Sequence, residues 1–239
     1  MRVVISLGGS VLAPDLDSSR VAGYAAVLES LADAGCEIGV VVGGGGVARD
    51  YITAARALDA NEVELDQLGI DVTRLNARLL GTALGEDANA VRTDEYDAAG
   101  AALRRGDIAL MGGMTPGQTT DAVAAILAES VDADLLVYAT SADGVYDADP
   151  ATDPDATKFA SLSPAELVDI VVPMSRDAGA SAPVDILAAK LIDRSAMRSV
   201  VLDGTDPKTV EAAVRRGEHS GTDIVPETSD DPVEWIHAE

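Results

Sequence analysis

The chain has 239 residues, of which 47% are hydrophobic, and its 17 Lys and Arg residues are outnumbered by 41 Asp and Glu residues, giving a formal charge of −24. This apolar content excludes an intrinsically disordered chain, because disorder combines high charge with few apolar residues. The acidity excludes nucleic acids and anionic membranes as expected partners, because binding phosphate needs cations that displace counterions.

Short apolar runs alternate with helical segments along the chain. In chain order we expect a strand at 3–7, a helix at 18–34, a strand at 38–42, helices at 47–58 and 61–84, a strand at 107–111, a helix at 121–131, a strand at 135–139, a loop at 140–157, helices at 164–171 and 184–195, a strand at 199–202 and a helix at 207–216. Strands that are apolar throughout and separated by helices are typical of a mostly parallel sheet buried on both faces. The pattern therefore predicts an α/β fold, with residues 1–226 as a single domain and 227–239 as an acidic, mobile tail.

Three of the expected strands end in glycine-rich turns, at residues 8–10, 43–46 and 112–113. In a parallel α/β sheet such turns emerge at the carboxyl edge, where ligands bind. A turn without Cβ atoms lets backbone N–H groups approach an anion, and the N-terminus of the following helix adds positive potential. The three turns together predict a polyphosphate or nucleotide site.

Two other phosphate-binding motifs bear on the kind of nucleotide. The chain contains no Gly-x4-Gly-Lys-Ser/Thr sequence, which excludes a P-loop. Gly43, Gly45 and Ala48 fit the loose dinucleotide fingerprint, with Glu64 or Asp66 near the expected position of a ribose-binding acid. That fingerprint normally follows the first strand of its domain, whereas here an earlier strand has its own glycine turn. An NAD-dependent enzyme is therefore an alternative reading.

Arg49 lies one turn into the helix that follows the second glycine turn. The planar fork of an arginine suits phosphate oxygens, so Arg49 is a candidate clamp for a bound phosphate. The alternative is a solvent-facing residue paired with Asp50 or Asp59.

Two further segments carry polar groups that suit a nucleotide. Residues 114–121 join a rigid Pro-Gly loop to a helix start, and Asp121 is a candidate either for the reaction or for capping that helix. Residues 140–150 follow a buried strand, with Tyr146 suited to pack beside a base or ribose and Asp149 suited to accept hydrogen bonds from sugar hydroxyls. Taken alone, the second segment fits an acidic surface loop equally well.

These segments, in this order, resemble the amino acid kinase superfamily and, within it, the archaeal uridylate kinase branch. The resemblance extends to about Pro226 and is carried by VVISLGGSV, VVVGGGGVARDYI, DQLGIDVTRLNARLL, GGMTPGQTTDAVAA and TSADGVYDADP. It implies a three-layer α/β/α sandwich on a mostly parallel, roughly eight-stranded sheet. It also implies phosphoryl transfer from ATP, with Mg²⁺, to UMP, giving UDP and ADP in pyrimidine nucleotide (CTP) biosynthesis, by a homohexamer.

The resemblance also implies roles for individual residues. The implied ATP-binding residues are Gly9, Ser10, Gly45, Arg49, Thr140, Tyr146 and Asp149. The implied UMP-binding residues are Gly44, Asp66, Met114, Thr115, Pro116, Gly117, Gln118, Thr119 and Thr120. Arg49 and Asp121 are implied in the transfer itself, Asp121 as the acid that organises the reaction centre. No side chain is assigned to the metal.

Two positions depart from the superfamily pattern. Many members carry a lysine in the first strand, where this chain has Ser6, and another near the start of the helix expected at 184–195, where this chain has Pro183. The archaeal uridylate branch tolerates both losses. Mg²⁺ and Arg49 are then the candidates for balancing the charge of the transferred phosphoryl group.

Other functions fit parts of the same pattern. Within the fold, the alternatives are kinases of isopentenyl phosphate, carbamate or acetylglutamate; outside it, an NAD-dependent enzyme or a non-catalytic nucleotide-binding regulator. The chain enters its first apolar strand without a basic segment or a long apolar stretch, so we expect a soluble, cytoplasmic protein. A lone cysteine, Cys36, excludes an internal disulfide, and two histidines exclude a zinc-type cluster.

The acidity generates a prediction about salt. Only three of the 17 cations are lysines, and salt at 1 M shortens the Debye length to about 3 Å, which screens the repulsion among surface carboxylates. The composition therefore predicts a protein of concentrated salt, the alternative being an acidic protein of ordinary salt. We expect the melting temperature to rise between low salt and molar KCl in thermal unfolding. A melting temperature that did not rise would contradict this interpretation.

Overall fold

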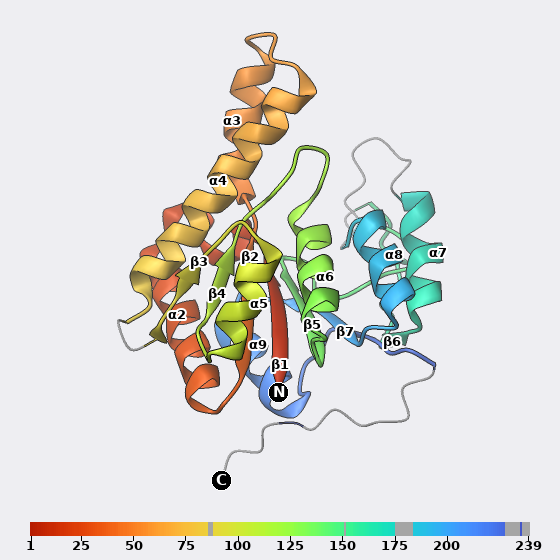
Figure 1. The fold of residues 1–239 in the computed structure, drawn as a ribbon. Helices are drawn as coiled ribbons and strands as arrows, with labels where there is room; N and C mark the ends of the chain where they lie inside the picture. The colour runs from red at the N-terminus through yellow and green to blue at the C-terminus, as the bar shows by residue number, and fades with distance from the viewer. Residues whose placement is uncertain (86–87, 151, 175–183, 228–234, 236–239) are drawn as a thin grey trace.

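The computed structural model describes residues 1–85, 88–150, 152–174, 184–227 and 235. Within these residues eight strands form one sheet in the order β3-β4-β2-β1-β5-β7-β8-β6 (Figure 1). The strands are β1 (Arg2–Leu7), β2 (Glu37–Val42), β3 (Val91–Arg92), β4 (Ala109–Met111), β5 (Leu135–Thr140), β6 (Ser161–Leu162), β7 (Ser199–Asp203) and β8 (Thr222–Ile224). Neighbouring strands are parallel except for the β7–β8 pair, so the expected mostly parallel sheet is confirmed.

Helices cover both faces of this sheet, as the α/β/α prediction requires (Figure 1). The helices are α1 (Gly9–Leu12), α2 (Ser18–Asp33), α3 (Gly45–Arg56), α4 (Glu62–Ala83), α5 (Tyr96–Arg104), α6 (Thr120–Ser130), α7 (Pro164–Met174), α8 (Ile186–Ser195) and α9 (Pro207–Arg216), with a 3-10 turn η1 (Pro14–Leu16). No helix among the described residues is both long and apolar enough to span a membrane.

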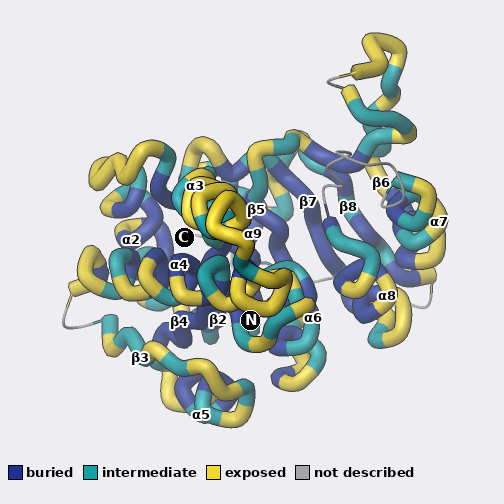
Figure 2. The backbone as a smooth tube through the Cα atoms, turned by 90° about the horizontal axis from the view of Figure 1, so that it is seen from above, coloured by how far each residue is buried: buried dark blue, intermediate teal, exposed yellow. Residues whose placement is uncertain are grey.

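Alternate residues of the central strands fill two separate cores. Val3, Ile5 and Leu7 of β1 pack with α1, α2, α4 and α9 on one face. Val4 of β1 and Tyr138 of β5 pack with α5, α6, α7 and α8 on the other. The strands are therefore buried between helices whose outer surfaces are exposed (Figure 2). This double burial explains why the strands are apolar along their whole length.

The strand register brings the ends of three central strands level at one edge of the sheet. Leu7, at the end of β1, pairs with Val42 of β2 on one side and with Ala139 of β5 on the other. The segments that leave these strands therefore start side by side. The α3–α4 pair extends beyond this same edge (Figure 1).

Several elements were not expected from the sequence. The edge strands β3, β6 and β8 have two or three residues each, too few to show a strand pattern. Helix α5 buries mainly small residues, Ala99, Gly100 and Ala102, beside Leu103, so it lacks the apolar stripe by which α2 and α4 are recognised. Helix α3 begins at Gly45 rather than at residue 47, because the glycine turn itself forms its first residues.

The C-terminal segment lies outside the described residues except for Glu227 and Trp235. The indole of Trp235 packs against the core cluster that contains α2 and α9. It lies so close to Gly217 that a Cβ there would be 2.6 Å from a ring carbon, and the guanidinium carbon of Arg198 is 5.9 Å from the ring centroid. Arg198 immediately precedes β7, so this contact lies at the opposite edge of the sheet from the ends of β1, β2 and β5.

Candidate functional site

The turns after β1 and β2 pack directly against each other through their backbones. A Cβ on Gly9 would lie 2.4 Å from both the carbonyl oxygen of Gly43 and the amide nitrogen of Gly45. A Cβ on Gly45, which has φ +63°, would lie 2.5 Å from the carbonyl carbon of Gly9. Side chains at either position are therefore excluded, and glycine is what allows the two turns to meet.

Asn76 of α4 fixes the second of these turns. Its buried side-chain amide donates to the carbonyl oxygens of Gly43, at 2.9 Å, and Gly44, at 3.3 Å. Sequence reasoning missed this residue, although a polar side chain on the apolar face of a helix is the signal that could have revealed it. The contact shows that the turn is held from below by a dedicated hydrogen-bond donor.

A cavity of about 620 Å³ opens beside the two turns. Its lining includes every residue that the resemblance implies for ATP, namely Gly9, Ser10, Gly45, Arg49, Thr140, Tyr146 and Asp149, together with Gly44, Thr120 and Asp121. These residues come from segments after β1, β2 and β5 and from the starts of α3 and α6. The cavity volume lies in the range of sites for nucleotide-sized ligands.

Arg49 reaches across the cavity from α3. Its guanidinium donates to the hydroxyl of Ser10, at 3.2 Å, rather than pairing with Asp50 or Asp59. The side chain is exposed and lines the cavity. An arginine held in this way is available to an anion that enters beside the glycine turns.

Asp121 lies at the floor of the cavity and does not cap α6. That cap is Thr119, whose hydroxyl accepts from the backbone N–H of Ala122 at 3.1 Å. The carboxylate of Asp121 instead accepts from the hydroxyl of Ser6, at 3.0 Å, and its backbone carbonyl accepts from the hydroxyl of Tyr138. Ser6 thus occupies the lysine position of many superfamily members and contacts the acid directly. Pro183, the other departure, lies outside the described residues.

Burial raises the pKa of Asp121 to about 6, and the nearby carboxylate of Asp185 adds to the effect. Hydrogen bonds from Ser6 and from the backbone N–H of Asp185 act in the opposite direction on the same pKa, but they are weaker. Enclosure by protein therefore outweighs the polar contacts of this carboxyl. A carboxyl so perturbed beside a cavity is a candidate functional group on physical grounds alone.

Only some of the residues implied for UMP line this cavity. Gly44 and Thr120 line it, whereas Asp66 and residues 114–119 do not. The carboxylate of Asp66 accepts from the backbone N–H of Gly117 at 2.7 Å. Met114 packs partly buried against the core, and the Thr115 carbonyl accepts from the backbone N–H of Gln118, so that with Pro116 these residues form a compact loop. We call residues 114–119 the acceptor loop below.

Helix α4 holds Gly113, the residue just before the acceptor loop, as well as Gly117 within it. The hydroxyl of Thr73 accepts from the backbone N–H of Gly113 at 2.6 Å, and Arg74 donates to the Gly113 carbonyl at 3.1 Å. Together with the contact between Asp66 and Gly117, these bonds attach the loop to α4 at two points. One helix thus positions both the turn after β2, through Asn76, and the acceptor loop.

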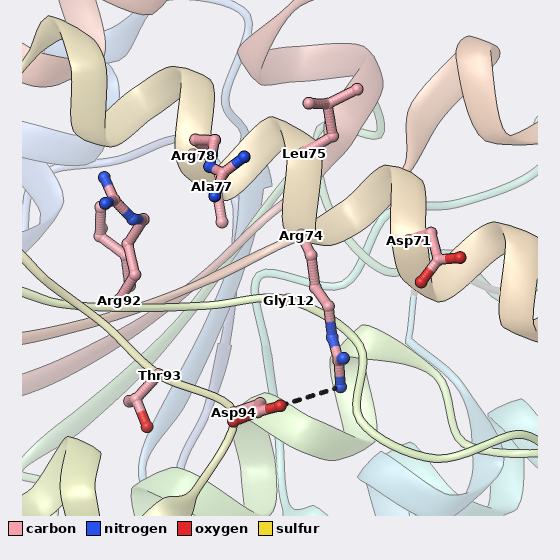
Figure 3. A pocket seen from close by; sticks show the side chains of 10 residues that line it. Asp71, Arg74, Leu75, Ala77, Arg78, Arg92, Thr93, Asp94 and Gly112 are labelled. Carbon is pink, nitrogen blue, oxygen red and sulfur yellow. Dashed lines mark ion pairs between the residues drawn. The ribbon is translucent and has the colours of Figure 1, made fainter.

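The third glycine turn does not line the main cavity. Gly112 borders a second cavity of about 400 Å³ beside α4, lined also by Arg74, Arg78 and Arg92 (Figure 3). Arg74 faces Asp94 across this cavity, with 3.6 Å between their charged atoms. Of the three expected phosphate-binding turns, two therefore share one cavity, and the third leads into the acceptor loop.

The segment after β5 is braced by two residues that sequence reasoning did not select. Asp143 accepts from the hydroxyl of Tyr146 and from the ammonium of Lys158, both at 2.9 Å. The hydrogen bond with Asp143 raises the pKa of Tyr146. The pKa of Asp143 is lowered mainly by its hydrogen bond from Lys158, and further by the one from Tyr146. Lys158 also donates to the carbonyl of Ser220, so it links the 140–150 segment to the residues just before β8. Side-chain hydrogen bonds from Tyr146 and Lys158 to Asp143 therefore hold this segment in place.

Comparison with known proteins agrees with this geometry. Residues 1–203 match the amino acid kinase family. The chain belongs to this family. It is 71% identical to a uridylate kinase of Halorubrum lacusprofundi, covering 98% of each chain, and 66% identical to one of Haloquadratum walsbyi over the full length of both. The crystal structure of a uridylate kinase from Archaeoglobus fulgidus superposes with a TM-score of 0.83 at 41% identity, covering 94% of this chain and all of that one.

The family membership confirms the sequence-based expectation, and so does the source of the relatives. Many of the curated relatives come from halophilic archaea, as the acidic composition predicts. In this amino acid kinase, Gly43 and Gly45 of the dinucleotide-like spacing are required where the second turn packs on Gly9, whereas Ala48 packs beside Gly44.

The raised pKa of Asp121 predicts how stability depends on pH. Because the pKa rises from 3.8 to about 6 on folding, the folded state binds this proton more tightly, and its stabilising effect is lost as pH rises from about 4 through 6. Asp121→Asn cannot ionise at this position and so avoids that loss. Above pH 7, its free energy of unfolding should exceed that of the wild type by up to about 3 kcal/mol. The difference should vanish near pH 4. Denaturant unfolding of the ligand-free protein across this pH range measures it.

A carboxyl whose pKa is shifted in the opposite direction supplies the control variant. Hydrogen bonds from Ser19 lower the pKa of Asp17, the N-cap of α2, so its contribution to stability is present at neutral pH and is lost in acid. Asp17→Asn should therefore be less stable than the wild type at neutral pH, with the difference closing as pH falls. Curves for Asp121→Asn that follow those of Asp17→Asn would contradict the assignment.

Proposed function

We propose that this protein is a uridylate kinase, which transfers the γ-phosphoryl group of ATP to UMP and releases UDP and ADP. The observation that carries the substrate is the 71% identity to a uridylate kinase over nearly the whole of both chains. The geometry supports the same reaction class, because two backbone-lined glycine turns, an arginine and two helix N-termini border one cavity. Phosphoryl transfer needs positioning and charge neutralisation more than covalent chemistry from the protein.

The ATP side of the proposal uses the main cavity. Gly9, Ser10 and Gly45 would present the phosphate-binding backbone, because side chains are excluded from the meeting point of the two turns. Tyr146 and Asp149 line the same cavity and would border the nucleoside end of ATP, with Thr140 at the end of β5 between the two regions. The bond from Tyr146 to Asp143 sets the direction of the phenol before ATP arrives.

The UMP side uses the acceptor loop and its attachment to α4. Gly44 and Thr120 line the cavity where the two substrates would meet. Asp66 would hold the ribose or base of UMP, and it already holds Gly117 of the loop. Binding of UMP and the shape of the loop are therefore linked through one carboxylate.

The reaction follows from this arrangement. A phosphate oxygen of UMP attacks the γ-phosphorus of ATP, and the bond from that phosphorus to the β–γ bridging oxygen breaks, leaving its electron pair on ADP. The UMP phosphate is ionised at neutral pH, so no general base is required. Arg49 and the N-termini of α3 and α6 would stabilise the negative charge that spreads over the transferred group.

Magnesium enters this proposal as part of the MgATP substrate, where it neutralises phosphate charge. Mg²⁺ retains several waters and binds mainly through substrate phosphates in such sites. Among the described residues, no group of three or more His, Cys, Asp or Glu side chains is arranged to hold a metal ion. No step is assigned to a metal-binding side chain.

We further propose that the protein acts in pyrimidine nucleotide biosynthesis in the cytoplasm, as a homohexamer. The names of the relatives support the pathway. The α3–α4 pair supports assembly, because it extends beyond the sheet edge (Figure 1). The two helices and the turn between them also expose Tyr51, Leu58, Val63 and Leu75. Exposed apolar side chains on a projecting pair of helices are typical of a surface that contacts another subunit.

Product analysis with a panel of acceptors tests the proposed function. The purified protein in high salt receives MgATP with UMP, CMP, isopentenyl phosphate, carbamate or acetylglutamate, and ADP and phosphorylated products are quantified. UDP formed far faster than any other product supports the proposal. A faster reaction with another acceptor indicates a different kinase of this family, and binding of UMP and ATP without UDP indicates a regulator. In a parallel assay with added NAD⁺, absorbance from reduced nicotinamide would indicate the NAD-linked alternative.

Arg49→Ala should lower turnover strongly, by about 100-fold, because the cavity loses the cation beside the transferred group. The fold should persist, since Arg49 is exposed and its described side-chain contact is the hydroxyl of Ser10. Steady-state kinetics together with circular dichroism measures both effects. Exposed Arg56, at the end of the same helix, gives a matched control as Arg56→Ala. Equal turnover in both variants would remove Arg49 from the mechanism.

Asp66→Asn should raise the KM for UMP by about 10-fold and leave the KM for ATP nearly unchanged. The amide keeps the shape of the side chain but loses the charge that strengthens the bond to Gly117 and would bind the ribose. Gln67, next to it, donates to Asp71 on α4 in the described part of the chain and supplies the control Gln67→Ala. Equal rises of both KM values in Asp66→Asn would count against placing Asp66 on the UMP side.

A further inference from the structure

Asp185, the residue before α8, contacts the start of α8, the acceptor loop and Asp121 at once. One carboxylate oxygen caps α8 by accepting from the backbone N–H groups of Leu187, at 2.7 Å, and Ala188, at 3.1 Å. The other oxygen accepts from the hydroxyl of Thr119. Its backbone N–H donates to the carboxylate of Asp121. No motif in the sequence singled out this residue.

The partner hydroxyl lies at a decisive position in the chain. Thr119 is the last residue of the acceptor loop and the N-cap of α6, where it accepts from Ala122. Because the same hydroxyl donates to Asp185, its orientation is fixed from both sides. Two residues further on, α6 carries Asp121 at the floor of the cavity. The junction between acceptor loop and reaction centre is therefore held by Asp185.

We propose that Asp185 is a positioning residue for phosphoryl transfer, whose carboxylate fixes the junction of the acceptor loop with α6 and whose backbone holds Asp121 against Ser6. This inference rests on the proposed function, because it gives the loop the task of holding UMP. Asp185 acts through Thr119 and Asp121 and is not itself assigned a contact with substrate. Its effect should therefore fall on UMP rather than on ATP.

The charges around Asp121 give a second signature. Asp185 faces it from the start of α8, Tyr138 from β5 and Ser6 from β1, while Arg49, Asp143, Tyr146 and Asp149 line the same cavity. The like charge of Asp185 favours the protonated form of Asp121. The bonds from Ser6 and Asp185 favour the ionised form, which we take as the working form. Removing the charge at position 185 should then extend activity to lower pH.

Asp185→Asn tests the inference, since it retains an oxygen for the α8 cap and removes the charge. Kinetics are measured with both substrates from pH 5 to 8 in the same high salt. We expect the KM for UMP to rise about 10-fold and the KM for ATP to change less than about 2-fold. We also expect the acidic limb of kcat/KM to move to lower pH by about half a unit or more.

Asp206→Asn is the matched control. Asp206 caps α9 in the same manner, accepting from the backbone N–H of Lys208 at 3.0 Å, and it does not line the main cavity. It should leave both KM values and the pH profile unchanged. If Asp185→Asn lowers only the melting temperature, as a lost cap would, and leaves the UMP KM and the acidic limb at wild-type values, the inference is overturned.

A second variant covers the case in which Asp185→Asn fails to fold. Thr119→Val keeps the shape of the side chain and removes the hydroxyl that Asp185 holds. It should reproduce the UMP-selective rise in KM, and in the double variant the two effects should be less than additive. A UMP KM equal to the wild type in Thr119→Val would contradict the inference. Wild-type enzyme that makes no UDP would instead contradict the proposed function, so the two failures are distinguishable.

Discussion

The close packing of the turns after β1 and β2 is the constraint on which the site depends. With 2.4 Å from a hypothetical Gly9 Cβ to atoms of Gly43 and Gly45, no other residue allows the two backbones to meet. The meeting is possible because β1 and β2 end level in the sheet. Helix α3 begins within the second turn, at Gly45. This start places the guanidinium of Arg49 within hydrogen-bond distance of Ser10, in the first turn. The strand register thus lets the two turns meet, the glycines permit the contact, and the contact determines where Arg49 lies.

The floor of the cavity is acidic where many superfamily members carry lysine. The hydroxyl of Ser6 donates to Asp121, and the carboxylate of Asp185 adds a like charge that raises the pKa of that acid. The positive potential comes instead from Arg49 and from the starts of α3 and α6. A site of this kind suits a chain that carries few lysines throughout.

The central fold and the two glycine turns could be predicted from local signals, whereas the full set of cavity-lining residues was implied by the family resemblance. Apolar runs that end in glycine place β1 and β2, and the Gly9, Gly45 and Arg49 predictions follow from those ends. Asn76 and Asp185 were not predicted, since their partners lie more than 30 and 60 residues away along the chain. The third glycine turn was expected at the shared site because it ends a parallel strand at the same sheet edge, whereas Gly112 borders a different cavity beside α4. Strands of two residues exist only through their neighbours, so no local pattern could reveal β3 or β6.

The seat of Trp235 has a practical consequence for spectroscopy. The chain contains a single tryptophan, and its indole rests on Gly217 and beside Arg198, at the sheet edge remote from the cavity. Intrinsic fluorescence will therefore report the departure of the C-terminus from the body of the protein. Because the indole lies at the opposite edge of the sheet from the cavity, nucleotide binding should leave tryptophan fluorescence unchanged. The indole can therefore serve as an internal reference for a fluorescent dye attached near the cavity.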